Sequence, residues 1–344
     1  MPEERKGLTY AASGVDISAA DKAKKALIKA LDFKRTGIGA PIPLTWGYAG
    51  LIDFGEHALA LTTDGVGTKV EVAKALNRWD TIGIDCVAMN VNDLVCVGAE
   101  PLAMVDYIVL PTPDPELTAK IAAGLSEGAR QSNISIVGGE TAIMPDLVKG
   151  VDLSGTALGF ARKDKIVDGS RIQAGDVILG VESSGIHSNG MTLARRILEQ
   201  AGAGYADPTP YDSSLTWGEA LLTPTRIYVK AILELLASGV EVRGLAHITG
   251  GGVTKLTRLT KKWEFLLDTP MKPPAVFTAL QKLGGVETKE MYRTFNMGMG
   301  FACIVPDRVK DDALRVLNKH FHARAVGRMA VGSGVWIPSL DLRF

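Results

Sequence analysis

The sequence predicts an α/β (α+β) protein built from two domains. Its 344 residues exceed the size at which one hydrophobic core usually stops growing. Apolar runs of strand length alternate with stretches of helical periodicity along the chain. The polar segment 162–165 and the following Asp168 indicate a boundary. We therefore expect an N-terminal domain over residues 1–168 and a C-terminal domain over residues 169–344.

In the first half, apolar residues at helical spacing predict a helix over 81–97, which Gly98 and Pro101 end. Asp114 and Pro115 are a helix cap and a first-turn proline, and they predict a helix to Ser132. The remaining expected elements are helices at 19–31 and 69–76, a Gly/Pro-rich loop at 37–43, and strands at 59–63, 102–110, 134–137 and 151–161. The continuous apolar run 134–137 is expected to be buried.

The second half continues the alternation. Strands are expected at 176–181 and 301–305, and a strand pair at 326–336 around its glycines. Helices are expected at 191–200, 225–238, 273–283 and 311–320, and another from Val253 onwards.

Bulk composition excludes several function classes. Lysine plus arginine total 38, as do aspartate plus glutamate, so no net field favours nucleic acid or an anionic membrane as a partner. The most apolar region, 82–110, contains too many acids to span a bilayer. The three cysteines form neither a disulfide framework nor a zinc pattern, and the charged N-terminus lacks a signal-peptide core. These features predict a cytoplasmic protein.

The stretch 64–93 carries the strongest chemical signal. Asp64, Gly65, Gly67, Thr68 and Lys69 follow a strand and open a helix, where backbone N–H groups and the helix dipole favour phosphate. Carboxylates beside phosphate require a hard cation, and Mg²⁺ takes one or two carboxylates together with phosphate oxygens. Asp64 and the later Asp93 therefore predict a Mg-nucleotide site. The spacing is not that of a Walker A loop, and a plain turn is the alternative.

Other polar residues fall at predicted strand ends and helix starts. Glu140 follows Gly138 and Gly139 and places a third acid at a strand end, where open α/β sheets gather ligands. The loops 183–190 and 247–252 feed helix starts and could each hold an anion. His187 suits proton transfer, with a structural histidine as the alternative. A serine hydrolase is excluded because no Gly-x-Ser-x-Gly motif surrounds Ser188.

Taken together, the motifs resemble the aminoimidazole ribonucleotide synthetase family, the phosphoribosylformylglycinamidine cyclo-ligases of purine biosynthesis. The matching segments run through almost the whole chain: 10–16, 63–69, 80–85, 92–94, 98–101, 138–141, 187–190, 222–228, 246–252 and 291–296.

The resemblance implies ATP-dependent closure of formylglycinamidine ribonucleotide to 5-aminoimidazole ribonucleotide, with release of ADP and phosphate. It implies a homodimer in which N-terminal strands of two subunits build a β-barrel, and a C-terminal mixed sheet with flanking helices that completes the substrate site. It also implies that ATP and Mg²⁺ are bound and that a small ribonucleotide is the partner.

The resemblance assigns roles to residues at the matching positions. Asp64 and Asp93 would hold magnesium, and Lys69 would neutralise phosphate. Beside these implied roles, we take His187 as the proton-transfer group on the chemistry of histidine. The further ATP contacts would be made by Gly65, Gly67, Thr68, Gly98, Ala99, Pro101 and Glu140. The ribonucleotide would be faced by His187, Ser188, Asn189, Thr249, Gly250, Gly251, Gly252, Arg293 and Asn296.

One segment departs from the family pattern. Members of the family usually have a Gly-Phe-Gly-type sequence before the segment that matches residues 63–69. Here residues 45–50 read Thr-Trp-Gly-Tyr-Ala-Gly instead. Selenophosphate synthetase and thiamine-monophosphate kinase share the Asp64 and Asp93 region, but the former normally carries an N-terminal reactive cysteine and the first cysteine here is Cys86. A non-catalytic nucleotide-binding regulator is the alternative from another class.

Overall fold

The computed structural model describes residues 8–14, 17–44 and 47–344. The motif residues Val15 and Asp16, and the departing residues Thr45 and Trp46, therefore lie outside the described residues.

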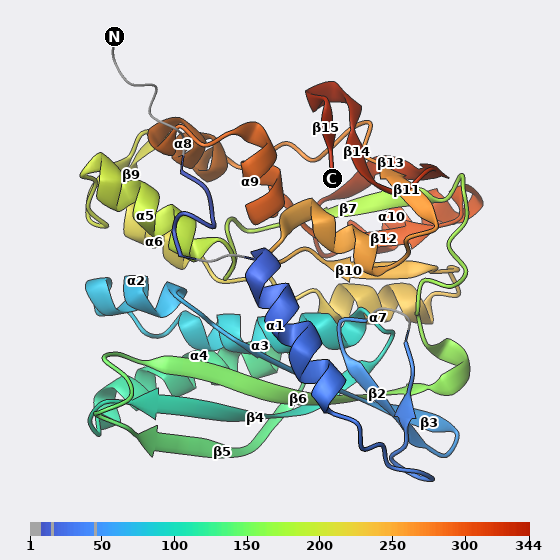
Figure 1. The fold of residues 1–344 in the computed structure, drawn as a ribbon, viewed down its shortest axis with the longest axis horizontal. Helices are drawn as coiled ribbons and strands as arrows, with labels where there is room; N and C mark the ends of the chain where they lie inside the picture. Colours follow the sequence, from blue (N-terminus) through green and yellow to red (C-terminus); the bar gives the residue numbers. More distant parts are fainter. Residues whose placement is uncertain (1–7, 15–16, 45–46) are drawn as a thin grey trace.

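The first sheet has six strands in the order β1-β2-β3-β6-β4-β5, and only β4 and β5 run parallel among its pairs. Two long helices, α3 (Ile82–Val95) and α4 (Pro115–Ser132), cover one face, while α1 (Ile17–Ala30) crosses in front of the molecule (Figure 1). The strands are β1 (Pro41–Ile42), β2 (Gly50–Phe54), β3 (His57–Gly65), β4 (Glu100–Leu110), β5 (Ser135–Ile143) and β6 (Asp152–Arg162). The short helix α2 (Lys69–Leu76) follows β3 directly.

The second sheet has seven strands in the order β10-β12-β7-β13-β11-β14-β15. They are β7 (Val177–Glu182), β10 (Gly244–His247), β11 (Trp263–Leu266), β12 (Met299–Val305), β13 (Ala323–Val331), β14 (Gly334–Ile337) and β15 (Leu342–Arg343). The helices of this half are α5 (Met191–Ala201), α6 (Trp217–Leu222), α7 (Val229–Ala237), α8 (Ala275–Gly284), α9 (Thr288–Thr294) and α10 (Lys310–Leu317). A small ladder of β8 (Pro208–Thr209) and β9 (Asp212–Thr216) stands apart.

The helix α3 lies between the two halves and is buried on almost every side, and its buried polar residues Asp85 and Asn92 are hydrogen-bonded to the segment before α7. Two glycines let α4 approach it closely: a Cβ at Gly83 would lie 2.3 Å from the backbone nitrogen of Leu125, and one at Gly124 would lie 2.3 Å from the carbonyl of Asp80. Asp114 caps α4 by accepting a hydrogen bond from the N–H of Leu117, as predicted. This packing fixes Asp93, on the last turn of α3, between the two sheets.

The structure corrects two expectations. The run 134–137 is not buried: β5 is the sheet edge, and Val137 is 66% exposed. The two strands around the final glycines do not pair with each other, because β11 lies between β13 and β14. The helix expected from Val253 onwards is present as a 3₁₀ helix, η2 (Gly252–Arg258).

The first sheet ends at Arg162 and the second begins at Val177, so the predicted domain boundary falls in the connection between them. Within the described chain, no helix combines the length and apolarity needed to cross a bilayer. All three cysteines are buried and free.

Candidate functional site

Two acids from different elements meet between the sheets. Asp64 is near the end of β3, and Asp93 is on α3. Burial raises the pKa of Asp64, the negative charge of Asp93 raises it further, and the N–H of Gly65 opposes both effects. Two negative charges that act on each other in a buried place favour a cation between them. We call Asp64, Asp93, His247 and Lys255 the carboxylate site.

His247 joins the site from the end of β10. Its Nδ1 lies 2.9 Å from Oδ1 of Asp93, which accepts the hydrogen bond. On the other side of the ring, Nε2 lies 3.4 Å from Nδ2 of Asn92. The imidazole is fully buried, so it orients the Asp93 carboxylate rather than facing solvent.

Lys255 on η2 brings a positive charge to the same place. Burial lowers its pKa, as does the neighbouring Arg258, while Asp93 and Asp64 oppose the change and leave the value at about 8. The hydroxyl of Tyr48 donates to the carbonyl of Lys255 at 3.0 Å, and Arg258 lies over the Tyr48 ring. Tyr48, within the departing segment, therefore holds η2 in place.

The turn after β3 is open at Gly67, whereas the N–H of Gly65 is already used within the turn. Gly67 has a φ of +65° with open space where a Cβ would be, and Oδ1 of Asp64 accepts from the N–H of Gly65 at 2.7 Å. Thr68 shares a hydrogen bond of 2.9 Å with Thr192 on α5. The turn thus contacts the C-terminal half through its threonine.

Lys69 is placed differently from the prediction. Its ammonium is fully buried, 2.9 Å from Oδ2 of Asp85, and donates to the carbonyl of Thr223 at 2.7 Å. Burial lowers the pKa of Lys69, against the opposing charge of Asp85. Because the ammonium already has two partners in the interior, this position does not support a phosphate contact by Lys69.

The two predicted substrate loops lie against each other. A Cβ on Gly250 would come within 3.2 Å of Oδ1 of Asn189, and Nδ2 of Asn189 lies 3.7 Å from Sδ of Met89 on α3. The Ser188 hydroxyl is buried without a partner among the described residues. Thr249, Gly251 and Gly252 are buried beside them. The structure therefore brings Ser188, Asn189 and the 249–252 loop together beside α3.

His187 is directed into the core. Its φ is +64°, its side chain is fully buried, and its Nε2 accepts from the N–H of Ser184 at 3.2 Å. Burial holds the pKa of His187 well below its usual range, and the positive groups around it lower it further. A neutral, enclosed imidazole matches the structural alternative and gives no support to proton transfer by His187.

Two residues predicted to contact the substrate, Asn296 and Arg293, lie outside the two loops that pack together. Asn296 is buried, donates to the carbonyl of Gly185 at 2.8 Å and accepts from the Ser183 hydroxyl at 2.8 Å. It therefore holds the 183–187 loop in shape. Arg293 is exposed on α9.

Gly98, Ala99 and Pro101, which were predicted as ATP contacts, are in packing positions after α3. Gly98 has a φ of +77°, and a Cβ there would lie 2.9 Å from the carbonyl of Lys165. Ala99 and Pro101 are buried, and Pro101 borders a separate cavity against α4 and α7. Glu140 is not at a strand end: it lies inside β5, exposed, and pairs with Tyr107 of β4.

Sequence reasoning missed His247 and Lys255 as members of the site, and also Asp106. Asp64 and Asp106 flank Gly155 on the neighbouring strand β6, and burial raises the pKa of Asp106. An acid in the middle of the apolar strand 102–110 was the available signal for Asp106. No pattern in the sequence indicates that η2 packs near β3, so Lys255 could not be predicted as a member of the site.

The fold and the site define a class of α/β protein. Two acids lie beside glycine-rich turns, between the N-terminal and C-terminal halves of the chain. The chain belongs to the AIR synthase related family: residues 46–161 match the N-terminal domain of AIR synthase related proteins, and residues 173–336 match the C-terminal domain.

Individual relatives are similar over nearly their full length. The chain is 53% identical to the phosphoribosylformylglycinamidine cyclo-ligase of Methanosarcina barkeri (strain Fusaro / DSM 804), covering 97% of this chain and 98% of the relative. It is 48% identical to the protein of the same name from Thermococcus kodakarensis (strain ATCC BAA-918 / JCM 12380 / KOD1), covering 98% and 99%. Among solved structures, AaThiL complexed with AMPPCP and TMP superimposes with a TM-score of 0.64 at 16% identity, covering 95% of this chain and 96% of that one.

Proposed function

We propose that the protein is an ATP-dependent cyclo-ligase that converts formylglycinamidine ribonucleotide to 5-aminoimidazole ribonucleotide and releases ADP and phosphate. The observation that carries this proposal is the near-complete similarity, at about half of all positions, to relatives named for this reaction. The carboxylate site and the two loops beside it supply what such chemistry needs from a protein.

The reaction has two bond changes. The formyl oxygen of the substrate attacks the γ-phosphorus of ATP, ADP leaves, and the oxygen becomes a phosphate ester. The amidine nitrogen then attacks the formyl carbon, the carbon–oxygen bond breaks, and phosphate departs as the ring closes. Phosphoryl transfer depends mainly on positioning and on charge stabilisation.

Different residues of the site would bind the phosphates, orient the Asp93 carboxylate and contact the ribonucleotide. The turn at Gly67 offers backbone close to phosphate, and Lys255, in place of Lys69, is the cation that faces the phosphate oxygens. His247 holds the Asp93 carboxylate in one orientation. Asn189 and the 249–252 loop form the side on which the ribonucleotide rests.

Magnesium fits the acids that are present. Among the described residues no group of three or more His, Cys, Asp or Glu side chains has metal-site geometry. The negative charges of Asp64 and Asp93 act on each other, so the two acids would hold Mg²⁺ together with nucleotide oxygens, which is the usual ligand set for this ion. When bound, it would neutralise charge on the β- and γ-phosphates.

We also infer a homodimer formed through the first sheet. The face opposite α3 and α4 has no covering element among the described residues, and it exposes Leu61, Leu102, Val105, Tyr107 and Val137. The edge strand β5 leaves backbone groups available for pairing. A second copy that covers this face would bury the apolar side chains and form the barrel between subunits. The free, buried cysteines are compatible with a reducing compartment such as the cytoplasm.

The test is a reconstituted assay with purified protein, ATP, Mg²⁺ and formylglycinamidine ribonucleotide. The proposal expects equal amounts of ADP and the aminoimidazole product. Phosphate transfer without ring closure would identify a kinase of the same superfamily. Nucleotide binding without any turnover would identify a regulator.

A further inference from the structure

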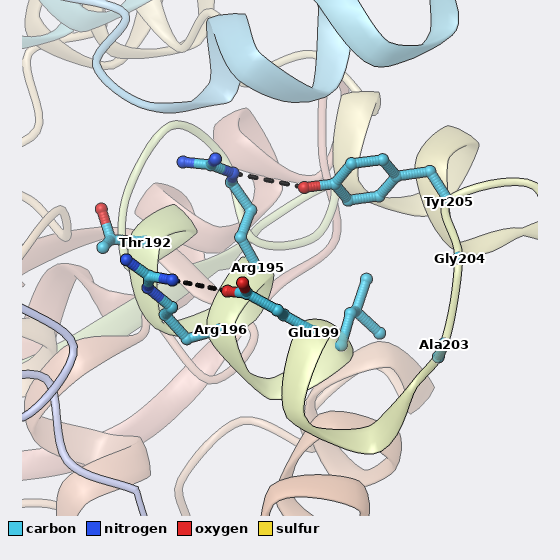
Figure 2. A pocket seen from close by; sticks show the side chains of 8 residues that line it. Thr192, Arg195, Arg196, Glu199, Ala203, Gly204 and Tyr205 are labelled. Carbon is cyan, nitrogen blue, oxygen red and sulfur yellow. Dashed lines mark hydrogen bonds and ion pairs between the residues drawn. The ribbon is translucent and has the colours of Figure 1, made fainter.

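A cavity of about 360 Å³ lies on α5 (Figure 2). One of its lining residues, Thr192, shares a hydrogen bond with Thr68 in the turn after β3. It is lined by one face of α5 and by the segment after that helix, including Thr192, Arg195, Arg196, Glu199 and Tyr205. None of these residues belongs to the carboxylate site or to the substrate loops described above. The volume is in the range of small-ligand pockets.

The two arginines that line this cavity differ in whether an acid neutralises them. Arg196 forms an ion pair with Glu199 at 2.6 Å on the exposed side of the helix, so those two charges offset each other. Arg195 has no acidic partner among the described residues; only its Nε is used, donating to the Tyr205 hydroxyl at 3.2 Å. Figure 2 shows that this bond anchors the side chain and leaves the two terminal nitrogens pointing away from Tyr205. A planar guanidinium with two free nitrogens is suited to two oxygens of one phosphate.

The cavity is connected to the proposed reaction centre. Thr192 lines it and bonds to Thr68, which is four residues after Asp64. Because four residues of chain span at most about 14 Å, Asp64 lies within about that distance of Thr68, which contacts the cavity through Thr192. A ligand with its reactive end at Asp64 and its other end at Arg195 would cross from the N-terminal half to the C-terminal half.

We propose that Arg195 and the cavity around it bind the 5′-phosphate of the ribonucleotide substrate. This inference rests on the proposed function, because it takes the substrate to be a phosphoribosyl compound. ATP is the other source of phosphate, and its triphosphate is instead held at the carboxylate site.

The experiment compares wild type with Arg195→Gln, which keeps most of the side-chain volume and removes the charge. The KM for formylglycinamidine ribonucleotide is expected to rise about 10- to 100-fold, the usual effect of losing hydrogen bonds to a charged group. The KM for ATP should not change. Arg315→Gln is the matched control, because Arg315 is an exposed arginine on α10, paired with Asp312.

A second arm uses ribose 5-phosphate as a binding probe, measured by calorimetry with no turnover required. Wild type should bind it and Arg195→Gln should not, while ribose without phosphate should bind neither. If wild type fails to turn over the ribonucleotide but still binds ribose 5-phosphate through Arg195, the proposed function fails and the phosphate site stands. Unchanged KM and unchanged probe binding in a folded Arg195→Gln protein would overturn the inference, as would a rise confined to the KM for ATP.

Discussion

The ammonium of Lys69 lies 2.9 Å from Oδ2 of Asp85, and both side chains are fully buried. Asp85 also accepts from the N–H and hydroxyl of Thr225, at 2.8 and 2.6 Å, and Lys69 donates to the carbonyl of Thr223. This network joins α2 and α3 to the segment before α7. The pair therefore ties the N-terminal half to the C-terminal half.

Replacing Lys69 by Met should destabilise the protein by about 3–5 kcal/mol, because Asp85 is left buried without its counter-charge. The loss is to be measured by urea unfolding, with the KM for ATP unchanged in the folded fraction.

Lys74→Met is the control for this substitution, since Lys74 is on the same helix with an exposed side chain. Its effect on unfolding should stay within about 0.5 kcal/mol. A Lys69→Met protein of normal stability and weakened ATP binding would restore the phosphate role predicted from the sequence.

Asp64→Asn should remove activity and raise stability together. The pKa of Asp64 is raised by burial and by Asp93, so the folded protein holds this proton more tightly than the unfolded chain does. Stability is therefore lost as pH rises from the ordinary value of about 3.9 through the raised one, and the ionised group still destabilises the fold at neutral pH. Asparagine keeps the acceptor for Gly65 and removes the charge. We expect turnover to fall about 10²- to 10³-fold, and the Tm without added metal to rise.

Asp80→Asn, at an exposed acid paired with Arg78, controls for the loss of a negative charge. It should change neither turnover nor Tm. A lower Tm for metal-free Asp64→Asn would show that the carboxylate supports the fold, contrary to this account.

Local patterns in the sequence were enough to place most elements of the fold. The helix α2 was predicted at its observed bounds, and the cap at Asp114 was found, because both depend on neighbouring residues. The exposure of β5 was not predictable, since a run of apolar side chains looks the same whether the protein's own core or a second subunit covers it. Edge position is a property of the whole sheet.

The candidate site likewise contains residues that local sequence predicts and residues that only the folded structure brings together. Asp64, Asp93 and the glycine turn follow from a strand, a turn and a helix close together in sequence. Lys69 stands in the same motif, but its four-carbon stem reaches Asp85, and no spacing rule distinguishes an inward lysine from an outward one. Lys255 reaches the acids only after the second half folds back on the first.

Lys255 predicts a pH dependence of ATP binding. With a pKa of about 8, its ammonium is charged at pH 7 and mostly neutral at pH 9. ATP affinity, measured by calorimetry, should fall across this interval because a positive charge beside the phosphates is lost. Lys255→Met should bind ATP weakly at both pH values, about 10- to 100-fold below wild type at pH 7.

Lys255→Arg should keep its affinity at pH 9, since a guanidinium does not deprotonate there. Lys282→Met, at an exposed lysine on α8, should follow the wild-type pH profile. If Lys255→Met retains the full fall in affinity between pH 7 and pH 9, another group causes it.

The uncovered face of the first sheet predicts how the proposed dimer can be broken. Val137 is 66% exposed on the edge strand β5, where an added charge costs an isolated subunit little. In a dimer that buries this face, an unpaired aspartate loses its hydration and costs several kcal/mol. Val137→Asp should therefore shift the protein from dimer to monomer in light scattering, with unchanged helix content by circular dichroism. Val331→Asp is the matched control, because Val331 on β13 is 84% exposed and belongs to the other sheet. A wild-type protein that is monomeric at micromolar concentration, or a Val137→Asp protein that remains dimeric, would place the interface elsewhere.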